Sequence, residues 1–264
     1  MGDRVQYPAR EKKMRSEMAP AKKIIHVVLP LALVLQLFSC KKENRWDLFK
    51  RTGEMTLETR VLDPFTDITV GSNRINVFIT QDKLLDVKVQ AGKNLLSNIR
   101  TEVRDGRLYI DDDNKCNFAR SYKFPVTVFI HMPKLNHIFH DGAGSIKSLN
   151  TLVSDTIDVI TKSAGDVALD VNCYRMSVHM HSVSDITVTG TCNDNICYAT
   201  GNGFYYSSGL ASSYCWVWAK TTGEIYVNVI GLLQVNIQSV GDVYYRGNPT
   251  VQDVHVGTGR LVKE

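Results

Sequence analysis

The feature that most constrains the fold of this 264-residue chain is a repeat of about 20 residues in its second half. A small residue followed by an alternating run of β-branched and aromatic residues returns six times after residue 140, at steps of 21, 19, 19, 20 and 18. A period of this length without a helical pattern is typical of a β-solenoid, in which stacked coils share one core. The small residues are Gly144, Gly165, Ser184, Gly203, Gly223 and Gly241.

The second part of each repeat predicts which side chains form that core. Counting eight and six residues back from successive small residues gives pairs that would point inward on neighbouring coils. The coil that ends at Gly203 departs from this register, because Ile196 and Tyr198 come one position late. We expect these two to point inward after a β-bulge. The pairs in register are Ile157 and Val159, Met176 and Val178, Cys215 and Val217, and Leu233 and Val235.

The corners of the predicted coils carry a second signal. A small residue lets the backbone turn tightly, through a positive φ or a close approach. Asp166, Asp185 and Asp242 each follow such a residue. We interpret them as caps that accept hydrogen bonds from backbone amides, in preference to ligands of a bound group.

The region before residue 140 predicts short strands separated by Gly, Asn and Asp. The Asp105-Gly106 turn signal favours a hairpin between Ile99–Val103 and Leu108–Ile110. A turn of helix is expected only at Gly92–Asn98. The predicted strands are Thr56–Leu62, Ile68–Val70, Ile75–Thr80, Leu84–Val89, Leu108–Ile110 and Val126–Ile130.

The N-terminus has the pattern of a targeting segment. Ile24–Phe38 is an apolar run behind Lys22 and Lys23, and it is shorter than the roughly 20 residues of a membrane span. It therefore predicts a signal peptide over residues 1–39. A start at Met18 would give a more typical signal, which makes residues 1–17 a candidate for a misassigned start.

The Leu-Phe-Ser-Cys sequence that ends at Cys40 resembles the lipobox of bacterial lipoproteins. This resemblance implies that Cys40 is acylated, that residues 40–55 form a tether, and that the partner of the N-terminus is a membrane. Lys41 and Lys42 follow in place of an aspartate, which by the same resemblance favours the outer membrane. The periplasmic and cell-surface faces both remain open.

Three segments resemble one known family: residues 64–81, 89–110 and 239–264. The family is the head GIN domain of putative auto-transporter adhesins. The resemblance implies a right-handed parallel β-helix over residues 56–264, an all-β solenoid with coils of about 20 residues, and a role in adhesion. It brings no catalytic residues, and residues 197–218 depart from the family pattern.

Charge and cysteine usage restrict the partners. Residues 40–264 carry 24 basic and 24 acidic side chains, so we expect no nucleic-acid partner. Cys173 and Cys192 each follow a small residue by eight positions and are expected on adjacent coils about 4.8 Å apart. A disulfide between them and a reduced pair both fit that spacing.

Catalytic and metal-binding motifs are sparse. The chain has no CxxC, GxSxG or P-loop sequence, and His179 and His181 lack a third ligand, so we expect no metal or cofactor. Stacked Asp166 and Asp185 would suit a polysaccharide-active enzyme, whose two carboxylates lie about 5–10 Å apart. Because corner capping explains both residues, we expect that the protein is not an enzyme.

Aromatic residues predict a binding surface. Trp216 and Trp218 flank the inward Val217 and should point outward, where rigid rings suit a glycan or a surface-protein ligand. The alternatives are a ladder that only stabilises the coils, and an architectural envelope rod or homo-oligomer joined through its end coils. The predicted surface consists of Trp216, Trp218, Tyr205, Tyr206 and Tyr214.

Overall fold

The computed structural model describes residues 52–71, 74–114 and 125–264; the predictions for the signal peptide and Cys40 lie outside them. In this part of the chain no helix is long and apolar enough to cross a membrane. Leu96–Asn98 form a short 3₁₀ turn, η3, inside the segment expected to hold one. The strands are β1 (Met55–Arg60), β2 (Asp67–Val70), β3 (Ile75–Gln81), β4 (Asp86–Gly92), β5 (Ile99–Arg104), β6 (Arg107–Asp112), β7 (Val126–Met132), β8 (His137–His140), β9 (Ile146–Ser148), β10 (Leu152–Thr161), β11 (Val167–Met180), β12 (Ile186–Ala199), β13 (Tyr205–Ala219), β14 (Ile225–Ile237), β15 (Val243–Gly247), β16 (Thr250–His255) and β17 (Leu261–Lys263).

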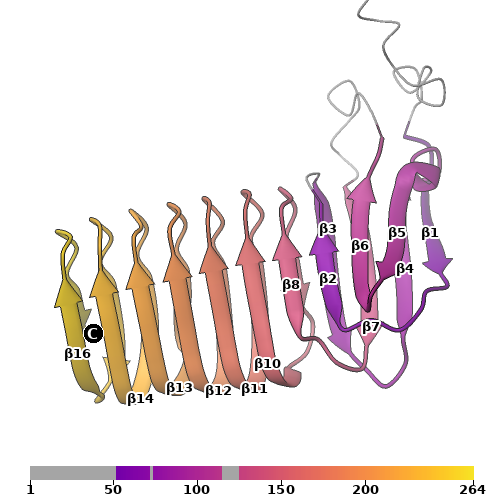
Figure 1. Cartoon of the computed structure of the whole chain (residues 1–264). Helices are drawn as coiled ribbons and strands as arrows, with labels where there is room; N and C mark the ends of the chain where they lie inside the picture. The colour runs from indigo at the N-terminus through magenta and orange to yellow at the C-terminus, as the bar shows by residue number, and fades with distance from the viewer. Residues whose placement is uncertain (1–51, 72–73, 115–124) are drawn as a thin grey trace, which may run out of the picture. The chain divides into compact units, whose positions relative to one another are not determined.

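The second half of the chain is the stack of coils that the repeat predicts (Figure 1). From β10 to β14 each coil contributes one long strand, which pairs in parallel with the next. The successive partners Val159, Val178, Cys197, Val217 and Val235 are 19, 19, 20 and 18 residues apart. The protein is therefore an all-β solenoid of about 7 turns with a spacing of about 19 residues.

Close backbone approach explains the glycines at the corners. A Cβ atom on Gly203 would lie 1.9 Å from the carbonyl oxygen of Ser184, and one on Gly223 would lie 2.0 Å from that of Gly203. In the same way, a Cβ atom on Gly241 would contact the carbonyl oxygen of Gly223, and one on Gly259 would contact that of Gly241. None of these four glycines has a positive φ, so space between coils, and not backbone strain, favours glycine here.

The inward positions form one continuous core, and the pairs predicted in register are buried. The expectation that Ile196 and Tyr198 point inward after a bulge is wrong. Asn195 and Cys197 are fully buried instead, and β12 pairs with β11 there without a register shift. The confirmed pairs are Ile157 and Val159, Met176 and Val178, Cys215 and Val217, and Leu233 and Val235.

A hydrogen-bond network explains why an asparagine takes a core position. The hydroxyl of Tyr205 donates to Oδ1 of Asn195 at 2.8 Å, and Nδ2 of Asn195 donates to Oγ of Ser207 at 3.2 Å. A buried amide is costly only when its polar atoms lack partners. The apolar pattern in the sequence could not reveal these partners, because they lie 10 and 12 residues along the chain.

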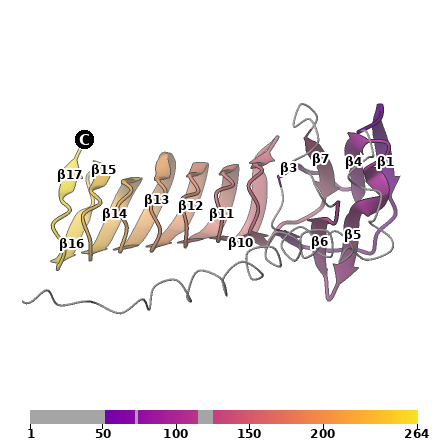
Figure 2. The ribbon, with the colours of Figure 1, turned by 90° about the horizontal axis from the view of Figure 1, so that it is seen from above.

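The first half of the chain stacks in an order that differs from its sequence. β2 lies between β6 and β8, and β3 lies between β7 and β9, with all these pairs parallel. The coil of β2 and β3 is thus inserted between coils that the chain forms later. Figure 2 shows β3, β6 and β7 of this half beside the regular stack that begins at β10.

Antiparallel strands complete this half. β1 pairs with β4, and β4 pairs with β7. β5 and β6 form the predicted hairpin, in which Asp105 has a φ of 50° and Gly106 a φ of 71°. Two left-handed residues in succession are the signature of the type I′ turn that matches strand twist.

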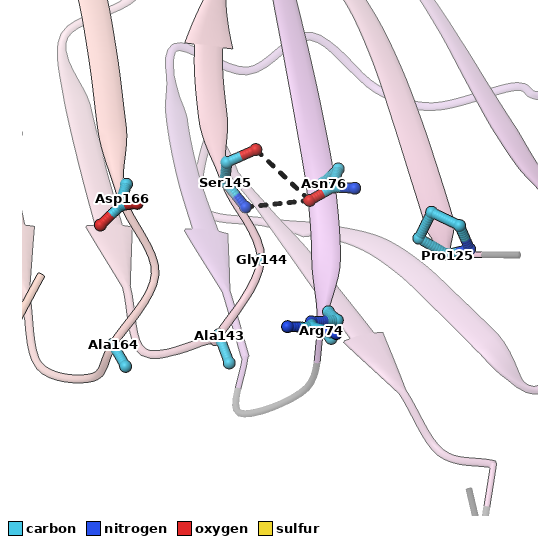
Figure 3. Close-up of a pocket in the computed structure, with 8 residues that line it drawn as sticks. All are labelled: Arg74, Asn76, Pro125, Ala143, Gly144, Ser145, Ala164 and Asp166. Atoms are coloured by element: carbon cyan, nitrogen blue, oxygen red, sulfur yellow. Dashed lines mark hydrogen bonds between the residues drawn. The ribbon is translucent and has the colours of Figure 1, made fainter. Parts of the chain in front are cut away.

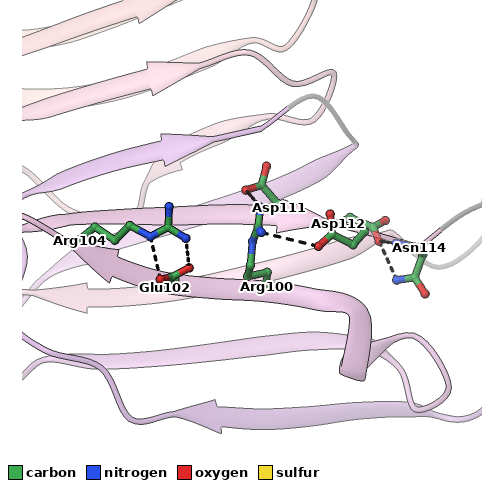
Figure 4. A network of polar contacts seen from close by, with 7 residues as sticks. Arg100, Glu102, Arg104, Asp111, Asp112 and Asn114 are labelled. Carbon is green, nitrogen blue, oxygen red and sulfur yellow. Dashed lines mark hydrogen bonds and ion pairs between the residues drawn. The ribbon is translucent and has the colours of Figure 1, made fainter. Parts of the chain in front are cut away.

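Charged side chains protect the edge strand β5, whose one strand partner among the described residues is β6 (Figure 4). Arg100 Nη2 donates to Asp111 Oδ2 at 2.9 Å. Arg104 donates to both oxygens of Glu102, at 2.7 and 2.5 Å. Charges along an edge strand oppose pairing with another chain.

The last coil ends in a polar pair. Asp253 and His255 lie opposite Val235 and Ile237, at positions that are apolar in the preceding coil. His255 Nδ1 contacts Asp253 Oδ2 at 2.8 Å, and its Nε2 contacts the carbonyl oxygen of Gly259 at 2.5 Å. The polar groups at these exposed positions are a second device against end-to-end stacking.

Candidate functional site

The predicted aromatic surface is divided by the structure into a core residue and two separate outer rows. Tyr205 is fully buried, so its expected place on the surface is wrong. Tyr206, the next residue, is 40% exposed in the first part of β13. Tyr214, Trp216 and Trp218 alternate with buried residues in the last part of β13 and point outward, as predicted.

The first row is a ladder of stacked rings, which we call the tyrosine ladder. Phe204 and Tyr206 have ring centroids 5.8 Å apart, Tyr206 and Tyr226 5.5 Å, and Tyr226 and Tyr244 4.8 Å. The hydroxyl of Tyr226 donates to Glu224 Oε2 at 2.6 Å, and this bond raises the pKa of Tyr226. Because these rings cover one another, the ladder serves mainly to join neighbouring coils.

The second row contains the two tryptophans, and their surroundings differ. Trp218 stacks on Tyr198 with a centroid distance of 4.4 Å and an interplanar angle of 3°. The rings of His179 and His181 lie 5.8 and 6.1 Å from that of Tyr198. Trp218 is therefore part of another cluster of rings between coils.

Trp216 lies instead in an open groove, and its ring stacks on no other ring in the described part of the chain. The groove has a volume of about 540 Å³. It crosses β10, β11, β12 and β13, which lie side by side in Figure 1. We call it the tryptophan groove; it is lined by Thr156, Asp158, Arg175, Ser177, Ile196, Tyr214 and Trp216.

Charges in the tryptophan groove are only partly balanced. Arg175 donates from Nη2 and Nε to Asp194 Oδ2, at 2.9 and 3.3 Å. Asn193 Nδ2 donates to the other oxygen of Asp194 at 2.7 Å. Asp158 forms no ion pair within the described residues, so its carboxylate oxygens are open to a ligand.

One rim of the groove is held by a chain of amides. The hydroxyl of Tyr214 donates to Gln234 Oε1 at 2.5 Å, and Gln234 Nε2 donates to Gln252 Oε1 at 2.6 Å. These bonds join three successive coils and limit the rotamers of Tyr214. A rim restrained in this way loses less entropy when a ligand binds.

The corner aspartates act as caps between coils, as predicted. Asp166 Oδ1 accepts the backbone N–H of Asp185 at 3.0 Å, Asp185 Oδ1 that of Phe204 at 2.9 Å, and Asp242 Oδ1 that of Arg260 at 2.8 Å. Each carboxylate thus bonds the next coil, 18 or 19 residues later. These bonds explain why Asp166 and Asp185 recur at this spacing, and the explanation needs no catalytic role for either residue.

A second hollow, of about 310 Å³, adjoins one of these corners (Figure 3). Asn76 Oδ1 points into it and accepts bonds from both N–H and Oγ of Ser145, at 3.0 and 3.3 Å. Asp166 also lines it, with Oδ1 engaged as described above. Its polar groups therefore join neighbouring strands, which makes this hollow a weaker candidate site than the tryptophan groove.

Cys173 and Cys192 lie opposite each other in register, as the period predicts, and the structure has both as free, buried thiols. Burial raises the pKa of Cys173 to about 11 and that of Cys192 to about 12. Thiols with such values are mostly protonated at neutral pH and are poor nucleophiles.

His179 and His181, whose rings lie near that of Tyr198, form hydrogen bonds with neighbouring hydroxyls. His179 Nε2 lies 3.3 Å from Ser177 Oγ, and His181 Nδ1 lies 3.0 Å from Thr200 Oγ1. Within residues 52–71, 74–114 and 125–264, no three His, Cys, Asp or Glu side chains gather as metal ligands would.

Sequence reasoning missed Asp158 and Arg175 as neighbours of Trp216. Asp158, Ser177, Ile196 and Trp216 are consecutive partners across four strands, at steps of 19, 19 and 20. Counting back by the repeat length would have found Asp158 from Trp216 and Arg175 from Tyr214. These residues form no charged cluster along the chain, because they are far apart in sequence.

Solved structures share this fold. A putative adhesin from Bacteroides fragilis has a TM-score of 0.74 at 23% identity, covering 80% of this chain and 97% of that one. A putative adhesin from Parabacteroides distasonis has a TM-score of 0.60 at 18% identity, covering 80% and 98%. A putative lipid binding protein from the same species has a TM-score of 0.60 at 20% identity, covering 80% and 97%.

At these identities the solved structures show the fold alone, and no curated protein matches the sequence. A family model does match, over residues 64–249, and that span contains the tryptophan groove and most of the coils. It agrees with the resemblance read from the sequence. The chain therefore belongs to the family described as putative auto-transporter adhesin, head GIN domain.

Proposed function

We propose that the protein is a surface-binding module of the bacterial envelope that holds a glycan in the tryptophan groove. The observation that carries this proposal is the ring of Trp216, which lies unstacked beside open polar groups. Binding sites typically combine an aromatic surface with a few polar groups that fix the orientation of the ligand. Trp216 offers the surface, and Asp158 and Arg175 offer the polar groups.

The composition of the groove favours a glycan over a protein ligand. Most of its lining is polar or charged, with Ile196 and Trp216 as the apolar exceptions. The centre of a protein interface is usually depleted of charge. One structure of similar fold is named a putative lipid binding protein, but an acyl chain would cover the carboxylate of Asp158 without offering it a hydrogen bond.

A binding role without catalysis agrees with the adhesin family, which suggests a surface or envelope location. We include in the proposal a lipid anchor at Cys40 that holds the protein at the outer membrane. It is supported by the lipobox-like sequence and the apolar run before it. The acyl chains would keep the coils near the membrane while the groove remains free.

The architectural alternative, a rod that assembles through its end coils, is less well supported. Arg100 and Arg104 on β5 at one end, and the Asp253–His255 pair at the other, place charges where a second copy would stack. Burying such groups without new partners would oppose association.

The test is a binding array of glycans and matrix proteins, using the full-length protein. We expect glycan binding that Trp216→Ala weakens at least about tenfold, or about 1.4 kcal/mol. The matched control, Tyr244→Ala, removes an outward ring from the tyrosine ladder and should leave binding unchanged. A blank array with folded protein would refute the proposal, and hits among matrix proteins alone would replace glycan by protein as the ligand.

A further inference from the structure

We infer that the tryptophan groove selects an uncharged oligosaccharide over an acidic one, and that Asp158 excludes the acidic sugars. This inference rests on the function proposed above and names the class of glycan. Three features of the groove carry it: its length across the coils, the balance of its charges, and the free carboxylate of Asp158.

The groove is longer than a single sugar ring, so its length favours an oligosaccharide. Asp158 and Trp216 are partners three strands apart, through Ser177 and Ile196. At a strand spacing of about 4.8 Å, they are separated by about 14 Å. A single sugar ring stacked on Trp216 could not also reach Asp158, so the groove fits an oligosaccharide that lies across the coils.

Asp158 and Arg175 line the groove and Asp194 lies beside it, so these three side chains together leave an excess of one negative charge. The guanidinium of Arg175 is engaged by Asp194, at 2.9 Å from Nη2. Asp158 has no such partner in the part of the chain that the structure describes. His137 pairs in register with Asp158 on the neighbouring strand β8, and burial, with the charge of Arg107, lowers the pKa of its ring and favours the neutral form.

This excess distinguishes between classes of glycan. A uronate or sulfate group next to Asp158 would meet a like charge in a partly desolvated groove, which costs binding energy. A hydroxyl of an uncharged sugar can instead donate to the free oxygens of Asp158. The same carboxylate therefore attracts neutral sugars and repels acidic ones.

The experiment measures affinity for two sets of hexasaccharides, with monosaccharides for comparison. The uncharged set contains cello-, manno-, xylo- and chito-oligosaccharides; the acidic set contains galacturonate, alginate and hyaluronan oligosaccharides. The full-length proteins are wild type, Trp216→Ala, Asp158→Asn and Asp155→Asn. Asp155 is the matched control, because it lies on the same strand, is 91% exposed and pairs with Lys134 outside the groove.

We expect wild type to bind an uncharged hexasaccharide through Trp216, at least about tenfold more tightly than its monosaccharide. Asp158→Asn should raise affinity for acidic hexasaccharides several-fold, and Asp155→Asn should not. Equally tight Trp216-dependent binding of acidic hexasaccharides would overturn the inference and leave the proposed function intact. Equal effects of Asp158→Asn and Asp155→Asn would overturn the role of Asp158. No Trp216-dependent binding to either set would overturn the proposed function and the inference with it.

Discussion

The tyrosine ladder and the tryptophan groove share the coil of β13 and both contain outward aromatic side chains, yet only in the groove does an aromatic ring stand beside open polar groups without stacking on another ring. Tyr226 stacks on a ring on either side along the coils, and Tyr206 stacks on Tyr226 and on Phe204, two residues before it. Trp216 has polar and aliphatic neighbours in its register row, Ile196 and Gln234. An outward aromatic residue is therefore a better binding candidate when no ring of a neighbouring residue stacks on it.

We expect the greatest loss of stability from a substitution in the core, compared with substitutions in the two outer rows. Tyr205→Ala should lower the free energy of unfolding by about 3–5 kcal/mol, because it leaves a cavity and removes the donor to Asn195. Urea unfolding measures this loss. Tyr206→Ala is the neighbouring control on the outside, and an equal loss in both variants would contradict the assignment of Tyr205 to the core.

The next effect tests the tyrosine ladder as a structural feature. Tyr226→Ala removes two stacking contacts and should lower the free energy of unfolding by about 1–3 kcal/mol, with glycan affinity unchanged. Parallel urea unfolding and binding titrations measure both quantities. Tyr226→Phe keeps the ring and loses only the bond to Glu224, so it should cost less. A loss of affinity with unchanged stability would assign the ladder to binding instead.

A smaller effect distinguishes the two tryptophans. Trp218→Ala removes the stack on Tyr198 and should cost about 0.5–1.5 kcal/mol of stability beyond the area lost. Glycan affinity should fall by less than about threefold, because the ring lies outside the groove lining. Calorimetry measures the affinity of Trp218→Ala and Trp216→Ala for the same glycan. Equal losses of affinity would show that both residues belong to one binding site.

The smallest effect concerns the last coil, beyond both rows. The Gly259 carbonyl and then the Asp253 carboxylate raise the pKa of His255. A raised pKa means that stabilisation is complete below the ordinary value of about 6.5 and is lost as pH rises through the folded value. The melting temperature of wild type should exceed that of His255→Gln at about pH 5.5, and the gap should shrink by about pH 8.5. A gap that is constant with pH would show that charge on His255 does not contribute.

Much of the fold could be predicted from local pattern. The spacing of Gly203, Gly223 and Gly241 indicated the coils, because a corner that touches the previous coil has no room for a Cβ atom. The alternation around Val217 indicated which side chains point outward. Both signals are short-range consequences of strand geometry, and so they are visible in a single sequence.

Other features depend on partners that are distant in sequence. The insertion of β2 between β6 and β8 has no counterpart in the repeat, which begins after residue 140. Asn195 breaks the apolar pattern, and only the contact with Tyr205 explains its burial. The predicted surface therefore included Tyr205 wrongly, and it missed Asp158 and Arg175, which reach the groove from neighbouring coils.

The family, the all-β solenoid and the inward or outward direction of most side chains in the regular coils can all be read from the sequence, because each follows from residues close together in the chain. The three-dimensional structure was needed to show that the ring of Trp216 is unstacked while those of Trp218 and Tyr226 are stacked. The physical reason is that ring stacking depends on side chains some 18 to 20 residues away, and on how their rings are oriented across neighbouring strands.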